Sequence, residues 1–344
     1  MAAAGEDRPW FSASPGLAEW LAQARVSIAL TTYQSGKLFT IGLREDGRLA
    51  VGARSFGHCS GLAGGPQTLW MATRYQLWRL ENVAGGGGGP HDRLYAPRLG
   101  YVTGAVNVHD IGVEADGGPV FVNTLFSCLA RPSAAASFTP AWRPPFVSAL
   151  APEDRCHLNG LAMRDGRSAF VTACAASDEP GGWRGRRADG GVAIEVDSGA
   201  IVLEGLSMPH SPRWHEGRLW LLNSGAGELG FAEPEGRFRP VRSCPGFARG
   251  LDFAGGCAVV GLSKATRGRG FEGLRLEAAL QRGEGARCGF DVVDAGSGAP
   301  RAWFRFEGVV DEVYDVVCLH GVMRPAAVGL KTSEVERVLN IGAA

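Results

Sequence analysis

The feature that most limits how this chain can fold is a ten-residue motif that recurs six times. Its copies read HCSGLAGGPQ (58–67), HDIGVEADGG (109–118), HLNGLAMRDG (157–166), HSPRWHEGRL (210–219), FARGLDFAGG (247–256) and EVYDVVCLHG (312–321). Each copy leads into an apolar run bounded by turn residues, and the copies start about 51 residues apart on average. Repeats of roughly 40–50 residues built from short strands are typical of β-propellers. The sequence therefore predicts an all-β, six-bladed β-propeller.

The ends of the chain predict how the ring closes. The sixth copy leaves room for only two strands before the C-terminus, and two strand candidates precede the first copy, within residues 26–55. We expect these N-terminal strands to complete the last blade, so that residues 1–344 form a single domain. Residues 1–25 form an N-terminal extension with a short helix, in which Ser14 is the cap and Pro15 the first helical residue. Residues 264–290 are expected to be an insertion in the fifth blade.

Charge and composition exclude several function classes. The chain has 35 basic and 35 acidic residues, which argues against a nucleic-acid or lipid partner. Its first residues, MAAAGEDRPWF, do not resemble a signal peptide, and no apolar stretch is long enough to span a membrane. We expect a soluble cytoplasmic protein that acts on a small molecule; the sequence does not indicate its oligomeric state.

Eight cysteines are scattered along the chain without any CxxC pair. Several lie inside apolar runs such as GCAVVGL. Small buried side chains are a better interpretation than disulfides or a zinc ribbon.

The first position of the six motif copies carries the main functional signal. In a propeller the innermost strands line the central channel, so equivalent residues at their starts form a ring around the axis. We call this ring the axial column, and its members are His58, His109, His157, His210, Phe247 and Glu312. A purely structural ring of histidines is one interpretation. A metal site is the other, because converging imidazoles without a cation would leave buried polar atoms unpaired.

Imidazole ligands favour a transition metal over calcium. Four histidines would leave one side of an octahedral ion open to substrate or dioxygen, so we expect Fe(II), with zinc as the alternative. Glu312 is expected either to bind the metal or to accept an N–H from a metal-bound imidazole.

Other polar residues near the axial column are candidates for binding substrate. Arg213 and Arg249 could hold a carboxylate between them, although an arginine in this position is equally expected to tie blades together. Tyr314 is a candidate acid or base, and Asp110 and Ser211 could orient histidines or bond loops.

The segments TTYQSGKLFTIG, HDIG, CHLNGLAM, MPHSPRWHEGRLWLLNSGAGEL and FARGLDF resemble an uncharacterised bacterial family of conserved hypothetical proteins. The resemblance spans nearly the whole chain and implies a β-propeller, sometimes fused to tetratricopeptide repeats, but no activity. Carotenoid-cleaving oxygenases, with iron on four histidines, and peptidyl-hydroxyglycine lyases, with zinc on three, are analogies of site design alone.

Three function classes remain open on the sequence. The first is a non-haem Fe(II) oxygenase or other oxidoreductase acting on a small, possibly anionic substrate. The second is a zinc-dependent lyase or hydrolase with three histidine ligands. The third is a non-catalytic propeller scaffold.

Overall fold

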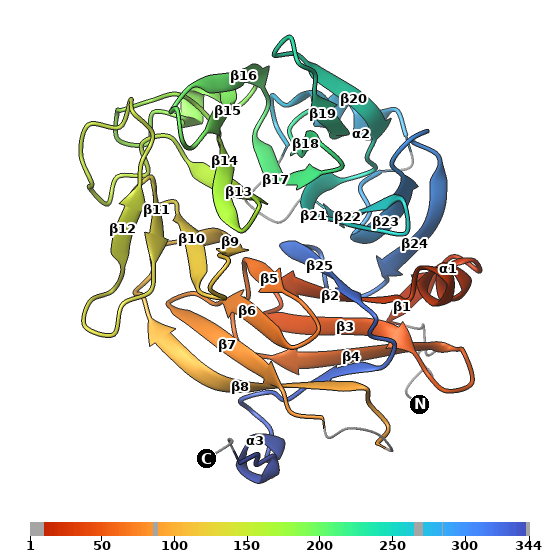
Figure 1. The fold of residues 1–344 in the computed structure, drawn as a ribbon. Helices are drawn as coiled ribbons and strands as arrows, with labels where there is room; N and C mark the ends of the chain where they lie inside the picture. The colour runs from red at the N-terminus through yellow and green to blue at the C-terminus, as the bar shows by residue number, and fades with distance from the viewer. Residues whose placement is uncertain (1–9, 85–88, 265–270, 284, 342–344) are drawn as a thin grey trace, which may run out of the picture.

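The computed structural model describes residues 10–84, 89–264, 271–283 and 285–341. Its strands form six mainly antiparallel sheets arranged around a central axis (Figure 1). The predicted six-bladed propeller is therefore confirmed. We number the blades in chain order and give the strands of each from the channel outward.

Blade 1 consists of β5 (Leu62–Gly64), β6 (Thr68–Ala72), β7 (Gln76–Asn82) and β8 (Arg93–Val102). Blade 2 consists of β9 (Val108–Val113), β10 (Pro119–Asn123), β11 (Cys128–Arg131) and β12 (Thr139–Trp142). Blade 3 consists of β13 (Leu158–Arg164), β14 (Arg167–Ala173), β15 (Gly191–Glu195) and β16 (Ile201–Leu206), with the 3-10 turn Arg184–Arg186 between β14 and β15.

Blade 4 consists of β17 (Pro209–His215), β18 (Arg218–Asn223), β19 (Glu228–Ala232) and β20 (Phe238–Ser243). Blade 5 consists of β21 (Phe247–Ala254), β22 (Cys257–Ser263), β23 (Gly289–Asp294) and β24 (Pro300–Phe306), with β1 (Phe11–Ala13) added at its outer edge. Blade 6 consists of β25 (Asp315–His320), β2 (Val26–Thr32), β3 (Lys37–Leu43) and β4 (Leu49–Ser55).

Blade 6 closes the ring by pairing the two ends of the chain. β25 pairs antiparallel with β2, from Thr31 opposite Asp315 to Val26 opposite His320. The division of strands differs from our expectation, because the C-terminal part supplies one strand and the N-terminal part three. The second C-terminal strand, β26 (Pro325–Ala327), instead pairs in parallel with β8 at the outer edge of blade 1. Its first residue is a proline, which has no N–H to donate and is tolerated at such an edge.

The helices lie outside the sheets. α1 (Leu17–Ala24) lies within the predicted helical segment, but Gly16 is its N-cap residue and no side chain caps it, so Ser14 and Pro15 do not have the expected roles. Leu17 and Leu21 are fully buried in the core shared by blades 5 and 6. α2 (Arg275–Gln281) lies between β22 and β23, and α3 (Glu334–Arg337) follows β26. No helix in the described parts of the chain is long and apolar enough to cross a membrane.

All eight cysteines are buried and free, as the sequence analysis predicted. Burial raises the pKa of all eight thiols, for example that of Cys156 to about 12. They therefore pack as small apolar side chains and are neutral at physiological pH.

Two kinds of hydrogen bond join neighbouring blades near the channel. A hydroxyl donates to a main-chain carbonyl at the start of the next blade in four pairs, namely Thr31–Ser60, Thr124–Leu158, Ser224–Ala248 and Ser263–Val313. At the same four blade junctions a side-chain oxygen accepts a main-chain N–H of the next inner strand, in the pairs Asp315–Leu62, Asp110–Leu161, Ser211–Gly250 and Asp252–Cys318. These buried bonds fix the relative height of the inner strands and so of the axial column.

Deleting residues 1–55 tests ring closure. We expect no soluble folded protein, because β25 would lose its only antiparallel partner and blades 5 and 1 would have no blade between them. The measurement is soluble yield and circular dichroism beside a chain that ends at residue 338, which removes the exposed Leu339 and Ile341. A monomeric, cooperatively unfolding 56–344 fragment would contradict this form of closure.

Candidate functional site

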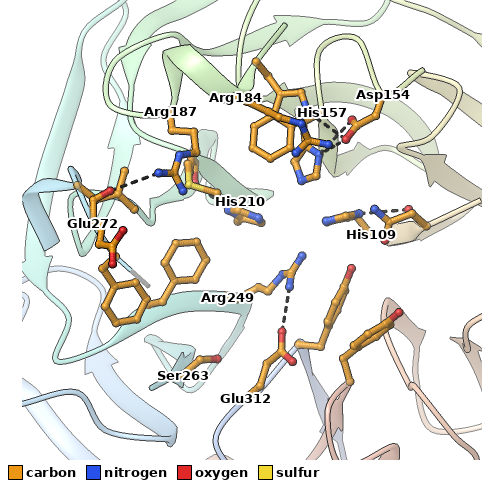
Figure 2. Close-up of a pocket in the computed structure, with 18 of the residues that line it drawn as sticks. His109, Asp154, His157, Arg184, Arg187, His210, Arg249, Ser263, Glu272 and Glu312 are labelled. Carbon is orange, nitrogen blue, oxygen red and sulfur yellow. Dashed lines mark hydrogen bonds and ion pairs between the residues drawn. The ribbon is translucent and has the colours of Figure 1, made fainter. Parts of the chain in front are cut away.

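Three of the four histidines of the axial column face one cavity at the end of the channel. His109 lies in β9, His210 in β17, and His157 immediately precedes β13. The ring centroid of His109 is 4.9 Å from that of His157 and 6.4 Å from that of His210. The cavity has a volume of about 520 Å³. Figure 2 shows the three rings and the Arg249 guanidinium around the same space.

His58 is not part of this group. It is exposed, and its ring contacts that of Tyr33 with a centroid distance of 4.9 Å. Tyr33 in turn contacts Tyr314, whose ring lies 5.7 Å from that of His109. Two tyrosines therefore stand between His58 and the other histidines, and the structure does not bring the fourth predicted ligand to the cavity.

Main-chain geometry fixes the tautomer of His109. Its Nδ1 lies 3.1 Å from the carbonyl oxygen of Asn107, which can only accept. It also lies 2.8 Å from Oγ1 of Thr124, whose own hydroxyl proton is donated to the carbonyl of Leu158. Nδ1 of His109 therefore carries the proton, and Nε2 presents a lone pair to the cavity.

His210 is held in the same way. Its Nδ1 donates to the carbonyl of Met208 at 2.8 Å. In both cases the acceptor is two residues earlier and has a left-handed backbone, with φ of 58° at Asn107 and 46° at Met208. This uncommon conformation turns the carbonyl back toward the ring that follows. Blades 2 and 4 thus orient an imidazole in the same way, through the carbonyl two residues before the histidine.

His157 is oriented by a carboxylate. Both oxygens of Asp154 lie 3.0 Å from its Nδ1, and Nε1 of Trp183 donates to the same carboxylate at 3.0 Å. The Trp183 ring also stacks on His157 with a centroid distance of 4.0 Å. Asp154 therefore accepts from two rings at once and fixes Nδ1 of His157 as the donor. Sequence reasoning missed Asp154 and Trp183, although an acid three residues before a candidate ligand is a signal that could have found Asp154.

Burial and a nearby cation keep two of the imidazoles neutral. Burial lowers the pKa of His109 and of His210 well below the usual value, and the positive charge of Arg249 lowers both further. Their Nε2 atoms are consequently unprotonated at neutral pH. The cavity thus contains lone pairs that accept a proton donor or a metal ion.

Arg249, Glu312 and Tyr314 line the same cavity. The Arg249 guanidinium lies 3.6 Å from the Glu312 carboxylate and 3.6 Å above the centre of the Tyr314 ring. Glu312 therefore pairs with the arginine and not with an imidazole. Burial raises the pKa of Tyr314, and its hydroxyl has no hydrogen-bond partner within the described residues. Tyr314 is thus a protonated donor available to a ligand.

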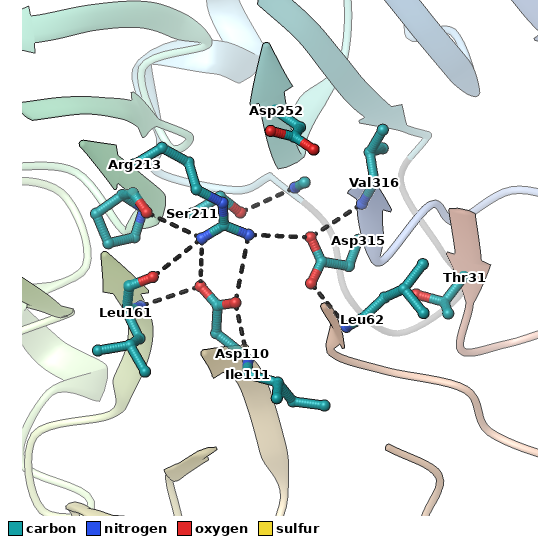
Figure 3. A network of polar contacts seen from close by, with 12 residues as sticks. Thr31, Leu62, Asp110, Ile111, Leu161, Ser211, Arg213, Asp252, Asp315 and Val316 are labelled. Carbon is teal, nitrogen blue, oxygen red and sulfur yellow. Dashed lines mark hydrogen bonds and ion pairs between the residues drawn. The ribbon is translucent and has the colours of Figure 1, made fainter. Parts of the chain in front are cut away.

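Arg213 lies deeper in the channel and does not line this cavity. Its guanidinium donates to Asp110 at 2.9 Å and reaches Asp315 at 3.4 Å, and it also donates to the carbonyl of Leu161 (Figure 3). Both carboxylates are almost fully buried. Burial raises the pKa of Asp315 to about 7, with a further contribution from the charge of Asp110. Arg213 therefore ties blades 2, 3, 4 and 6 together, as the structural interpretation of this arginine predicted. It does not act with Arg249 to hold a ligand carboxylate.

As the side chains stand, no group of three or more His, Cys, Asp or Glu residues in the described parts of the chain is positioned to hold a metal ion. Two imidazoles on one tetrahedral zinc have ring centroids about 5 Å apart, estimated from Zn–N bonds of about 2 Å. The separation of His109 and His157 fits this value, whereas that of His109 and His210 is wider. Bringing the His109 and His210 rings to this separation would need side-chain closure by roughly 1 Å.

Replacing Arg213 by methionine tests the axial tie. Removing the cation leaves Asp110 and Asp315 buried and facing each other, so we expect the free energy of unfolding at pH 8 to fall by about 3–5 kcal/mol. The loss should be smaller at pH 5, because Asp315, with its raised pKa, is protonated there. Urea unfolding at both pH values measures the effect, with the exposed Arg237→Met as control. An equal loss at both pH values would contradict the role given to Asp315.

Comparison with known proteins identifies the family but no activity. The family described as "Domain of unknown function (DUF4915)" matches residues 15–328, so the chain belongs to this family. No curated protein matches the sequence.

Solved structures support the fold alone. A chain of a nidogen–laminin complex matches with a TM-score of 0.55 and 9% identity, over 86% of this chain and 99% of that one. A protein of unknown function from Bacteroides caccae matches with a TM-score of 0.51 and 10% identity, over 86% and 98%. Virginiamycin B lyase from Staphylococcus aureus matches with a TM-score of only 0.42 and 14% identity, over 68% of this chain and 73% of that one.

Proposed function

We propose that this member of the DUF4915 family is a metal-dependent lyase or hydrolase acting on a small anionic substrate. In this proposal one zinc ion binds Nε2 of His109, His157 and His210. One observation carries it: three imidazoles have Nδ1–H committed to fixed acceptors, so three Nε2 atoms are left to face one cavity. Metal-binding histidines are typically oriented in this way by a carbonyl or carboxylate.

A metal fits this donor set better than an anion does. Neutral imidazoles whose Nδ1 carries the proton offer lone pairs at Nε2, and an anion has no proton to give them. Zinc is favoured over Fe(II) because the expectation of iron depended on four histidine ligands, and His58 lies on the far side of Tyr33. Three histidines with one open position are typical of catalytic zinc.

The other cavity residues have roles that follow from their contacts. When bound, the metal would act as a Lewis acid toward a substrate oxygen. Arg249, held by Glu312, is placed to bind a substrate carboxylate through charge-assisted hydrogen bonds. Tyr314 keeps its proton because burial raises its pKa, so its hydroxyl can donate a hydrogen bond to a group that becomes negative.

The metal content of single alanine variants tests this proposal. His109→Ala, His157→Ala and His210→Ala should each lose most of the zinc that the parent binds at about one equivalent per chain, since three ligands are the minimum for such a site. His58→Ala is the matched control and should retain it. The measurement is metal analysis by mass spectrometry after expression with both zinc and iron supplied.

Each outcome of that measurement has a defined meaning. Loss of metal from His58→Ala as well would restore the four-histidine arrangement, and iron in the parent would restore the oxygenase expectation. A parent that binds no zinc or iron under these conditions would overturn the metal-dependent function and favour a non-catalytic scaffold.

Asp154→Asn tests how His157 is oriented. The neutral amide accepts a weaker hydrogen bond from Nδ1, so we expect zinc affinity to fall by about 10- to 100-fold while the fold is retained. Competition with a chelating dye measures the affinity. Asp116→Asn, in an exposed turn, should leave it unchanged. Equal affinities for Asp154→Asn and the parent would exclude Asp154 as a positioning residue.

A further inference from the structure

We infer that the substrate carries a flat apolar group in addition to its anionic group, and that Phe271 and Leu274 are specificity-determining residues. Both belong to the segment between β22 and β23 of blade 5, of which the structure describes residues 264, 271–283 and 285–288. This inference rests on the proposed function for the location of the reacting atoms. It concerns a different wall of the same cavity.

One wall of the cavity is apolar and begins beside a proposed metal ligand. The Phe247 ring, at the start of β21, contacts the His210 ring edge-on with a centroid distance of 5.4 Å. The Phe271 ring lies parallel to that of Phe247, with an interplanar angle of 3° and a centroid distance of 5.9 Å. Leu274 and Met208 line the cavity with them. An apolar surface next to a reactive centre is suited to an apolar part of the substrate.

This apolar wall is anchored to the neighbouring blades. The main-chain N–H of Leu276 donates to the carbonyl of Gly225 at 3.0 Å, and the Leu276 side chain is fully buried. A Cβ atom at Gly227 would lie only 2.7 Å from Cδ1 of Leu276, so the absence of a side chain at Gly227 lets the leucine pack there. Arg187 of blade 3 donates to the carbonyl of Glu272. The wall is therefore held in place before any ligand binds, which lowers the entropic cost of binding.

The charged groups lie mainly on other sides of the cavity (Figure 2). The basic residues that line it are Arg184, Arg187, Arg249 and Lys264, and the acidic ones are Asp154, Glu272 and Glu312.

Two of these acids already have partners: Asp154 accepts a hydrogen bond from His157, and Glu312 pairs with Arg249. Glu272 is exposed and follows Phe271 in the sequence. The balance favours an anion at Arg249 over a cation, with the apolar group against Phe247 and Phe271.

An aryl-substituted carboxylic acid meets both requirements. Its ring would pack beside Phe271, its carboxylate would bind Arg249, and the intervening carbon atoms would lie near the three Nε2 atoms. Burying one aromatic ring on such a wall strengthens binding by about tenfold to hundredfold over the acid that lacks the ring.

The experiment compares three probes on the full-length protein by ligand-observed NMR titration. They are 3-phenylpropionate, propionate and 3-phenylpropylamine, which test the ring and the charge separately. We expect 3-phenylpropionate to bind at least about tenfold more tightly than either of the others. Phe271→Ala should reduce the preference for 3-phenylpropionate over propionate by about tenfold.

Two further variants keep the test independent of folding defects. Phe271→Leu retains an apolar side chain and should show an intermediate preference. Phe138→Ala removes a half-buried phenylalanine that packs on Phe126 in blade 2, and it should leave the preference unchanged. Equal binding of 3-phenylpropionate and propionate, an unchanged preference in Phe271→Ala, or tighter binding of the amine would each overturn the inference.

Failure of the proposed metal site has a different signature. The titrations are carried out on protein stripped with a chelator and on protein supplied with zinc. A preference for the aromatic acid that persists in a protein unable to bind zinc supports the apolar wall and contradicts only the metal-dependent function. Zinc binding without any preference for the aromatic acid would support the metal-dependent function and contradict the apolar wall as a binding surface.

Discussion

The ion pairs of Arg213 with Asp110 and Asp315 are the contacts on which the centre of the molecule depends. One guanidinium from blade 4 satisfies carboxylates from blades 2 and 6, and both carboxylates also accept main-chain N–H groups of the next blade. A buried ion pair of this kind is stabilising only while all its members are present, because each remaining charge would otherwise be unpaired. The arrangement therefore specifies how the inner strands lie relative to one another across the axis.

The geometry of the candidate site depends on the hydrogen bonds at the blade junctions. Thr124 illustrates the coupling: its hydroxyl donates to the carbonyl of Leu158 in blade 3 and accepts from His109 in blade 2. One side chain thus joins two blades and fixes a tautomer. Because the imidazoles are positioned from three blades, small errors in blade spacing would separate them, and the hydrogen bonds at the junctions restrict such errors.

The cavity contains the Arg249 cation together with the neutral imidazoles of His109 and His210. Arg249 would oppose a bound metal ion by charge repulsion, but Glu312 partly neutralises it and a bound carboxylate would do so further. A bound substrate anion would therefore attract both the metal ion and the arginine and offset the repulsion between them. The stacked Phe247 and Phe271 rings of the same cavity add no charge and leave this balance unchanged.

The repeat by itself determined the number of blades, the closure of the ring by N-terminal strands, and the equivalence of His58, His109, His157 and His210 along the chain. It could not determine which of these side chains point to the axis, because that depends on backbone conformation. His58 and His157 have positive φ, of 49° and 50°, yet only His157 has an aspartate and a tryptophan that hold it at the cavity.

The partners of Arg213, 102 and 103 residues away, were also invisible to local patterns. Contacts between blades arise only when the ring closes, so the tertiary structure alone decided that Arg213 ties blades together and that Arg249 lines the cavity.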